Sequence, residues 1–281
     1  MPRLPLTERL HSKARGLEAL PLPRALALLH EGDREATRAV GRALPALARL
    51  ATLAARALAS GGRIVYVGAG TSGRLGALDA AECPPTFGVS PSRVIALVAG
   101  GARALRRALE GAEDDGGAGR RDVRRAKVGA RDLVVGISAS GTTPYVLAAL
   151  EEARLRRATT GLVTSNPAAR PRGARRVLLE TGPELVAGST RMKAGSATKM
   201  ALSLLSTAAM LRLGKVVDGR MVDLVPTSSK LRLRAKRMVM DLALATAPQA
   251  EAALAASGWR VRAAVQALGR SSRAGSRSRQ G

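Results

Sequence analysis

Five short apolar runs in the middle of the chain constrain its fold more than any other feature. They lie at residues 64–67, 94–98, 133–137, 160–164 and, more weakly, 176–179. Each run is continuously apolar rather than alternating, which is typical of strands buried on both faces of a parallel sheet. Stretches that are expected to be helical separate them, at 73–81, 102–109 and 144–153. The alternation predicts an α/β fold, with a doubly wound parallel sheet of five strands flanked by helices.

Helical patterns also flank the predicted sheet. Apolar residues recur at helical spacing over 33–59, where Pro45 is expected to kink or divide the helix, and a long helix is expected over 190–213. The composition changes beyond residue 219. We therefore divide the chain into an N-terminal helical segment (1–60), a sheet domain (61–225), a small C-terminal helical unit (226–269) and a Ser-, Arg- and Gly-rich tail (270–281), whose composition predicts disorder.

The formal net charge of +25 raises the question of a polyanionic partner. A nucleic-acid binder would use such charge to neutralise phosphates. However, the arginines are scattered along the chain, and aromatic residues, which could stack on bases, make up only 1% of it. This pattern favours solvated surface cations over a nucleic-acid interface. The positive field should still favour anionic small molecules.

Cysteine use and hydropathy bear on the protein's location. Cys83 is the only cysteine, so an internal disulfide and a cysteine-based metal cage are both excluded. The start of the chain does not resemble a signal peptide, and the apolar stretch 200–213 is short and contains Arg212. We expect a cytoplasmic protein without a membrane partner.

A glycine loop, GAGTSG at 68–73, follows the first predicted strand and leads into a helix. Glycines permit a tight turn, and the free amides at a helix start attract phosphate. A dinucleotide site would also need an acidic residue at the end of the second strand, and that strand ends in Val98-Ala-Gly-Gly. The loop therefore predicts a sugar-phosphate site that includes Gly70, Thr71, Ser72 and Gly73, although a simple turn is the alternative.

A second loop, SASGTTP at 138–144, follows the third strand in the same way. Its hydroxyls and backbone amides could converge on a phosphate, and Pro144 can occupy the first turn of the next helix. N-capping by Thr142 or Thr143 is the simpler explanation, but capping needs one hydroxyl and the loop offers several. We expect Ser138, Ser140, Gly141 and Thr142 to bind phosphate.

Two carboxylate-bearing segments complete the candidate site. Glu82 lies in ECPPTFG, where the double proline is expected to end the first helix, and Phe87 could partly desolvate the carboxylate. Glu113 lies in the acidic run EGAEDD at 110–115, for which a solvated turn is the alternative.

These segments together resemble the N-acetylmuramic acid 6-phosphate etherases. The resemblance is carried by GAGTSGRLGALDAAECPPTFG (68–88), EGAEDD (110–115), GISASGTTPYV (136–146), GSTRMKAGSATK (188–199) and LSTAAMLRLGKVVDGRMVD (205–223), and it covers about residues 7–268. The glucokinase regulatory proteins form a related branch that is not enzymatic. The chain departs from the family pattern at Ser228-Ser229-Lys230, where the family has Asn-Glu-Lys, and in its short C-terminal end.

The resemblance implies a sugar isomerase (SIS) domain that works as a homodimer without a metal or organic cofactor. It implies a carbon-oxygen lyase that converts N-acetylmuramate 6-phosphate and water to N-acetylglucosamine 6-phosphate and D-lactate in peptidoglycan (amino sugar) recycling. By motif position, Glu82 corresponds to the family's proton donor and Glu113 to its second catalytic glutamate. Ser189, Thr190, Arg191 and Lys193 either approach the ligand at the start of the long helix or serve only as caps and surface charge.

The proposed chemistry suits two carboxylates. In the open-chain sugar, the C2 proton lies beside an aldehyde and the lactyl ether sits on C3, so removal of that proton allows lactate to leave. The reaction needs one base and one acid, which exchange roles when water adds to the alkene. The alternatives from other classes are a non-catalytic sugar-phosphate-sensing regulatory protein, a nucleic-acid binder and a sugar-phosphate isomerase.

Overall fold

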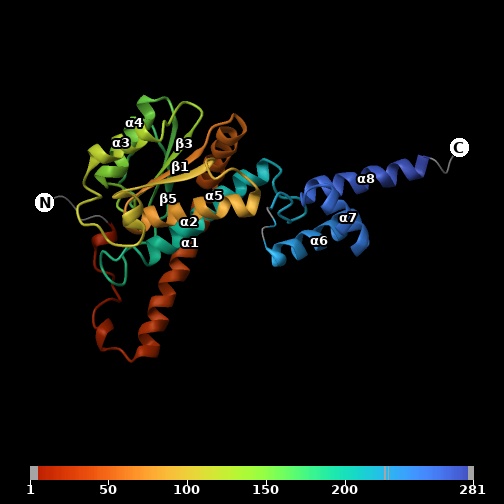
Figure 1. Ribbon diagram of the computed structural model, residues 1–281. Helices are drawn as coiled ribbons and strands as arrows, with labels where there is room; N and C mark the ends of the chain where they lie inside the picture. The colour runs from red at the N-terminus through yellow and green to blue at the C-terminus, as the bar shows by residue number, and fades with distance from the viewer. Residues whose placement is uncertain (1–5, 225, 227, 278–281) are drawn as a thin grey trace. The chain divides into compact units, whose positions relative to one another are not determined.

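The computed structural model describes residues 6–224, 226 and 228–277, which form two compact units (Figure 1). The first unit takes in the chain up to Ala81 together with Pro91–Ala209, and the second takes in Glu82–Ser90 and the chain from Met210 onward. These units group residues by spatial packing. The segment boundaries that we placed at residues 60, 225 and 269 stay a prediction.

The first unit is built on a five-stranded parallel sheet, which confirms the predicted fold class. The strands lie in the order β2-β1-β3-β4-β5, with bounds β1 Ile64–Gly68, β2 Val94–Val98, β3 Leu133–Ile137, β4 Thr159–Thr164 and β5 Arg175–Leu178. Every residue of β1 and β3 is buried, as expected for central strands covered on both faces. The register aligns Gly68 with Val98 on one side and with Ile137 on the other.

Helices cover both faces of this sheet (Figure 1). Val65, Val67 and Val134 share one core cluster with side chains of α3 (Gly116–Arg125) and α4 (Pro144–Leu155). On the opposite face, α2 (Gly70–Phe87) comes so close that a Cβ built at Gly76 would lie 2.9 Å from Tyr66 Cβ. Helix α1 (Leu22–Ala59) packs there too, with Leu50 over Gly161. The alternation of side chains along each strand therefore assigns each helix to its layer.

A buried polar network fastens α2 to the sheet. The Tyr66 hydroxyl donates to one carboxylate oxygen of Asp79 at 2.8 Å, and the Ser206 hydroxyl donates to the other at 3.0 Å. These residues belong to β1, α2 and α5 (Lys193–Arg212). Because a buried carboxylate is costly without partners, the two hydroxyls stabilise this junction of three elements.

The helices expected between the strands differ from those in the structure. The stretch 102–109 is not an α-helix: the structure has a short 3-10 helix there, η3 (Gly101–Leu105). The sequence reading also missed α3, which has three glycines in its first four residues but is capped by the Asp115 carboxylate, which accepts from Ala118 N–H at 2.7 Å. Two further 3-10 helices, η1 (Leu6–Glu8) and η2 (Leu17–Ala19), precede α1.

The prolines interrupt their helices less than expected. Helix α1 is continuous through Pro45, and α2 continues through Pro84 and Pro85 to Phe87. Proline in the last turn removes donors but leaves its own carbonyl free, and the Pro84 carbonyl accepts from Gly88 N–H at 2.9 Å. Gly88 has φ +63°, the left-handed conformation in which helices commonly end.

The second unit contains three C-terminal helices, α6 (Ser229–Ala243), α7 (Ala247–Ala256) and α8 (Val261–Arg277). Its core joins residues of these helices with the loop before them, and includes Val222, Leu224, Val239, Leu254 and Val261. Helix α8 passes through residues 270–277, part of the segment whose composition predicted disorder, and residues 278–281 lie outside the described residues. Among the described helices, none combines the length and the hydrophobicity needed to cross a bilayer.

Candidate active site

The candidate site lies where the winding of the sheet reverses. β2 lies on one side of β1 and β3 on the other, so the carboxyl ends of β1 and β3 form the crevice in which open α/β sheets bind ligands. Both predicted phosphate loops follow these two strands. The topology therefore brings Gly70–Gly73 and Ser138–Thr142 to the carboxyl-terminal end of the same sheet.

The loop after β1 needs glycine because its backbone folds back on itself. A Cβ built at Gly68 would lie 2.6 Å from the Gly73 nitrogen, and one at Gly73 would lie 2.7 Å from the Gly68 carbonyl oxygen. Gly70 has φ +51° and begins α2. Gly70 is exposed, whereas Thr71 and Ser72 are half-buried. The first turn of α2 thus presents backbone amides and two hydroxyls beside the crevice.

The loop after β3 gathers its hydroxyls into one cluster. Ser138 Oγ lies 2.8 Å from Thr143 Oγ1 and 3.4 Å from Ser140 Oγ, while the Thr142 hydroxyl donates to Ser140 Oγ at 2.9 Å. Thr143 takes the N-cap position of α4, yet its hydroxyl is engaged with Ser138 rather than with a helix amide. Simple capping therefore does not account for the cluster.

Gly141 and Asn166 hold this loop in shape. Gly141 has φ +71°, and a Cβ there would lie 2.5 Å from Ala169 Cβ and 2.9 Å from Thr164 Oγ1. The Asn166 side-chain amide donates to the Ser140 carbonyl at 2.7 Å. Only glycine fits position 141 without moving the loop after β4, so the hydroxyl cluster depends on this residue.

The acidic run places Glu113 beside the glycine turn. Gly70, Arg74, Glu110 and Glu113 line a pocket of about 130 Å³. The Glu113 carbonyl accepts from the Tyr145 N–H at 2.9 Å, which ties the acidic run to the helix that follows the hydroxyl loop. Glu113 itself is exposed, so its carboxylate is accessible to a ligand. Asp115 has a structural role as the cap of α3.

Arg74 fixes the chain that leads into the acidic run. Its guanidinium donates to the carbonyls of Ala104 at 3.1 Å, Leu105 at 3.3 Å and Arg107 at 3.2 Å. One side chain on α2 thus satisfies three loop acceptors. Sequence reasoning did not single out Arg74, because its partners are backbone atoms that no motif reveals.

Glu82 occupies a different setting from Glu113. It is exposed near the C-terminal end of α2 and belongs to the second unit, whereas Glu113 belongs to the first. Within the described ranges there is no group of three or more His, Cys, Asp or Glu side chains that could hold a metal ion. The hydroxyls and amides at the sheet edge suit a phosphate better than a metal.

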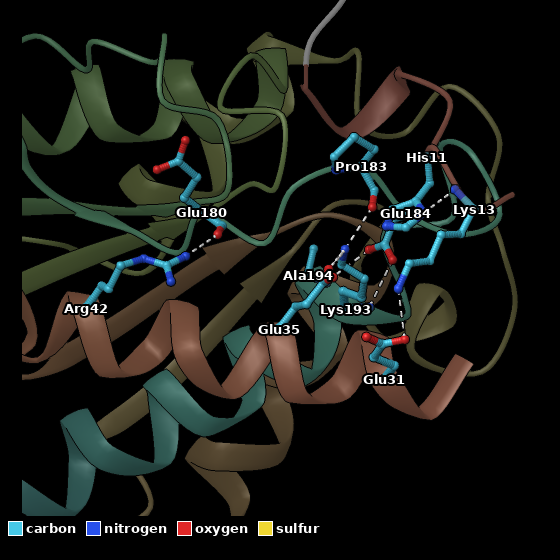
Figure 2. Close-up of polar contacts among 10 residues, drawn as sticks. All are labelled: His11, Lys13, Glu31, Glu35, Arg42, Glu180, Pro183, Glu184, Lys193 and Ala194. Carbon is cyan, nitrogen blue, oxygen red and sulfur yellow. Dashed lines mark hydrogen bonds and ion pairs between the residues drawn. The ribbon is translucent and has the colours of Figure 1, made fainter. Parts of the chain in front are cut away.

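The start of α5 differs from the expected arrangement, because the helix begins at Lys193 rather than near Thr190. The Glu184 carboxylate accepts from the backbone N–H groups of Lys193 at 3.0 Å and Ala194 at 2.9 Å (Figure 2). Glu184 therefore supplies the cap from outside the helix. Ser189 and Thr190 precede the helix in a tightly turned segment.

The ammonium group of Lys193 is not available to a ligand in this arrangement. Lys193 is buried, pairs with Glu35 of α1 and donates to the Pro183 carbonyl at 2.9 Å (Figure 2). Burial raises the pKa of Glu184, while its two backbone donors and Lys193 act in the opposite direction. Sequence reasoning missed Glu35 and Glu184; a glutamate within the otherwise apolar stretch GPELV was the available signal.

Arg191 is the exposed cation of the same segment. It lines a separate pocket, together with Thr71 of α2 and Lys199 of α5. A Cβ built at Gly195 would lie 3.6 Å from Thr71 Cγ2, so the first turn of α5 packs against the first turn of α2. Of the four candidate residues at 189–193, Arg191 is thus the one placed at a pocket beside the glycine loop.

Comparison with known proteins identifies the family. The chain is 47% identical over 266 residues to the N-acetylmuramic acid 6-phosphate etherase of Halalkalibacterium halodurans. The aligned region spans 92% of this chain and 88% of that protein. This chain belongs to the N-acetylmuramic acid 6-phosphate etherase family. The etherase of Deinococcus radiodurans is likewise 47% identical, over 93% of this chain and 87% of its own length.

Two further matches concern parts of the chain. The family model of the glucokinase regulatory protein N-terminal SIS domain matches residues 46–154. A phosphoheptose isomerase from Francisella tularensis superimposes with a TM-score of 0.52 at 15% identity, covering 68% of this chain and all of the isomerase. This structural likeness supports the fold alone.

Proposed function

We propose that this protein cleaves the D-lactyl ether of N-acetylmuramate 6-phosphate, giving N-acetylglucosamine 6-phosphate and D-lactate. The observation that carries the proposal is the crevice at β1 and β3, where the hydroxyl cluster and the Glu113 pocket flank the glycine turn. Relatives of the etherase family at 47% identity support the choice of substrate. The reaction would serve peptidoglycan recycling.

In this proposal the hydroxyl loop binds the phosphate. Ser138, Ser140 and Thr142 would turn their hydroxyls from one another to the phosphate oxygens, while Gly141 keeps the loop open. Amides at the start of α2 add donors beside Gly70 and Thr71. Anchoring the phosphate would place the opened sugar chain along the sheet edge towards Glu113.

Glu113 is proposed as the base and Glu82 as the acid. Glu113 removes the C2 proton, the C3–O bond breaks, and Glu82 protonates the departing lactate oxygen. Water then adds across the C2–C3 double bond: its hydroxide forms a bond to C3 and a proton returns to C2. The two carboxylates exchange roles in this second step, so neither needs a cofactor to regenerate it.

The test compares three substitutions, each of which replaces one carboxylate by an amide and so removes one negative charge. Glu82→Gln and Glu113→Gln are expected to lower the rate of lactate release by roughly 10²–10⁴-fold each, because each removes one acid–base group. Asp114→Asn, at an exposed position in the same acidic run, is expected to stay within about twofold of the parent. A Glu82→Gln or Glu113→Gln protein that releases lactate at the parental rate would refute that residue's role.

The second candidate is a sugar-phosphate sensor without turnover, since the glucokinase regulatory domain model matches residues 46–154. The relatives named as etherases, at 47% identity, do not favour it over the enzyme. A sensor would bind the sugar phosphate and release no lactate. Incubating the parent protein with N-acetylmuramate 6-phosphate and assaying D-lactate separates the two functions directly.

We also propose that the protein is a cytoplasmic homodimer that does not bind nucleic acid. The resemblance to the etherase family supports the dimer, and light scattering of the purified protein tests it. For nucleic acid, we expect only weak association with DNA that salt abolishes, despite the charge of +25, because scattered arginines offer no localised interface.

A further inference from the structure

A second pocket shares the first turn of α2 with the pocket that Glu113 lines. It has a volume of about 470 Å³ and is lined by residues of α1, α2 and α5 and of the segment before α5. Gly70 lines the Glu113 pocket and Thr71 lines this one, so adjacent residues of one turn separate them. We call it the Arg191 pocket. Both pockets therefore begin at the first turn of α2.

The Arg191 pocket carries two cations that the fold leaves unused. Within the part of the chain that the structure describes, neither Arg191 nor Lys199 forms an ion pair with a carboxylate, and both side chains are exposed. Lys193, which lies between them in sequence, is by contrast buried against Glu35. The segment therefore uses one cation for structure and leaves two facing the pocket.

The remaining walls are of two kinds. Leu75 and Met200 provide an apolar surface, and Thr37 of α1 lies against the Met200 sulfur at 4.0 Å. Asp33 is the one carboxylate among the lining residues, and it accepts the Ser196 hydroxyl at 3.1 Å. The pocket thus offers a net positive charge of one beside an apolar wall, which suits a small monoanion that carries a methyl group.

We propose that the Arg191 pocket binds the lactyl arm of the substrate. Arg191 and Lys199 hold the lactyl carboxylate, and Leu75 and Met200 contact its methyl group. This inference rests on the proposed function and extends it, because it assigns the group that distinguishes the substrate from its sugar-phosphate product. Asp33 limits the net charge to one, which lets lactate leave after the ether bond breaks.

The assignment predicts a particular pattern of selectivity. N-acetylmuramate 6-phosphate and N-acetylglucosamine 6-phosphate share the phosphate and the acetamido sugar and differ in the lactyl arm. Removing a cation from the Arg191 pocket should therefore weaken binding of the first and leave binding of the second unchanged. Substituting a residue of the phosphate site would weaken binding of both sugar phosphates equally. Substituting a residue that affects only the stability of the fold would weaken binding of neither.

The experiment uses Lys199→Met and, as a second variant, Arg191→Gln, both checked for folding by circular dichroism. We expect the KM for N-acetylmuramate 6-phosphate to rise tenfold or more and inhibition by D-lactate to be lost. Inhibition by N-acetylglucosamine 6-phosphate should stay within twofold. Arg49→Met, an exposed position of α1, removes the same charge and should change none of these constants.

Each other outcome overturns the assignment. Equal weakening of both sugar phosphates would place Lys199 at the phosphate, and unchanged constants in both variants would remove the Arg191 pocket from the site. Lactate release by the parent protein is measured in the same assay. If the parent releases none, the proposed function fails first, and calorimetric binding of the two sugar phosphates to the parent and to Lys199→Met tests the pocket without turnover.

Discussion

The Glu184 carboxylate accepts a hydrogen bond from the Lys193 backbone N–H at 3.0 Å, and its second oxygen accepts from the next amide of the helix. This contact fixes where α5 begins, and with it the segment that carries Arg191. Because Glu184 is buried, its two donors would lack a partner without it.

We expect Glu184→Ala to lower the free energy of unfolding by about 2–4 kcal/mol, since two buried amides lose their acceptor. Glu180→Ala is the matched control, because the Glu180 side chain is exposed and Figure 2 shows it pointing away from this network. Urea unfolding followed by circular dichroism measures both. A loss below about 0.5 kcal/mol in Glu184→Ala would contradict the capping role.

Gly141→Ala tests the hydroxyl loop. An alanine there must adopt φ +71° and meet Ala169 at 2.5 Å, so we expect a stability loss of about 2 kcal/mol or more and a displaced loop. The KM for the sugar phosphate should rise in parallel. Gly129→Ala is the control, since no described atom lies within 4 Å of a Cβ built there. Equal behaviour of the two variants would show that the loop tolerates a side chain.

Glu152 should make stability depend on pH. Bidentate hydrogen bonds from Arg124, at 2.9 and 3.0 Å, and one from Arg156 at 3.0 Å lower the pKa of Glu152 to about 2. A lowered carboxyl pKa stabilises the fold above the ordinary glutamate value of 4.5. That contribution is then lost as the pH falls from about 4.5 to about 2.

We therefore expect Glu152→Gln to be less stable than the parent by about 1–2 kcal/mol at pH 7, a value reduced for the exposure of the arginines. The difference should shrink as the pH is lowered through this window. Glu151→Gln, whose ion pairs are 3.8 and 4.0 Å long, should match the parent. If the stability difference between Glu152→Gln and the parent stays constant between pH 7 and pH 2.5, the lowered pKa of Glu152 is not its cause.

The sequence predicted the sheet well because the signal was strong and local. Strands buried on both faces must be continuously apolar, and the five runs match β1 to β5 within one residue at each end. The two loops after β1 and β3 were recognisable as turns, because glycine and hydroxyl clusters directly follow the strands. That these loops bind phosphate stays a prediction.

The parts that sequence reasoning missed depend on contacts between distant residues. Lys193 was expected either to approach the ligand or to serve as a cap or surface charge, and neither reading included Glu35, 158 residues earlier, which pairs with it. The glycines of α3 concealed its helical character. The Arg191 pocket is lined by both Asp33 and Lys199, which lie far apart in the sequence. Neither composition nor periodicity reports which helix faces meet.

Reaction in heavy water tests the central claim most directly, namely that C2 deprotonation precedes loss of lactate. The parent protein is incubated with N-acetylmuramate 6-phosphate in deuterium oxide, and lactate and the sugar product are analysed by mass spectrometry and NMR. We predict lactate release with one solvent deuterium at C2 of N-acetylglucosamine 6-phosphate. Lactate release with only protium at C2 would contradict elimination and hydration.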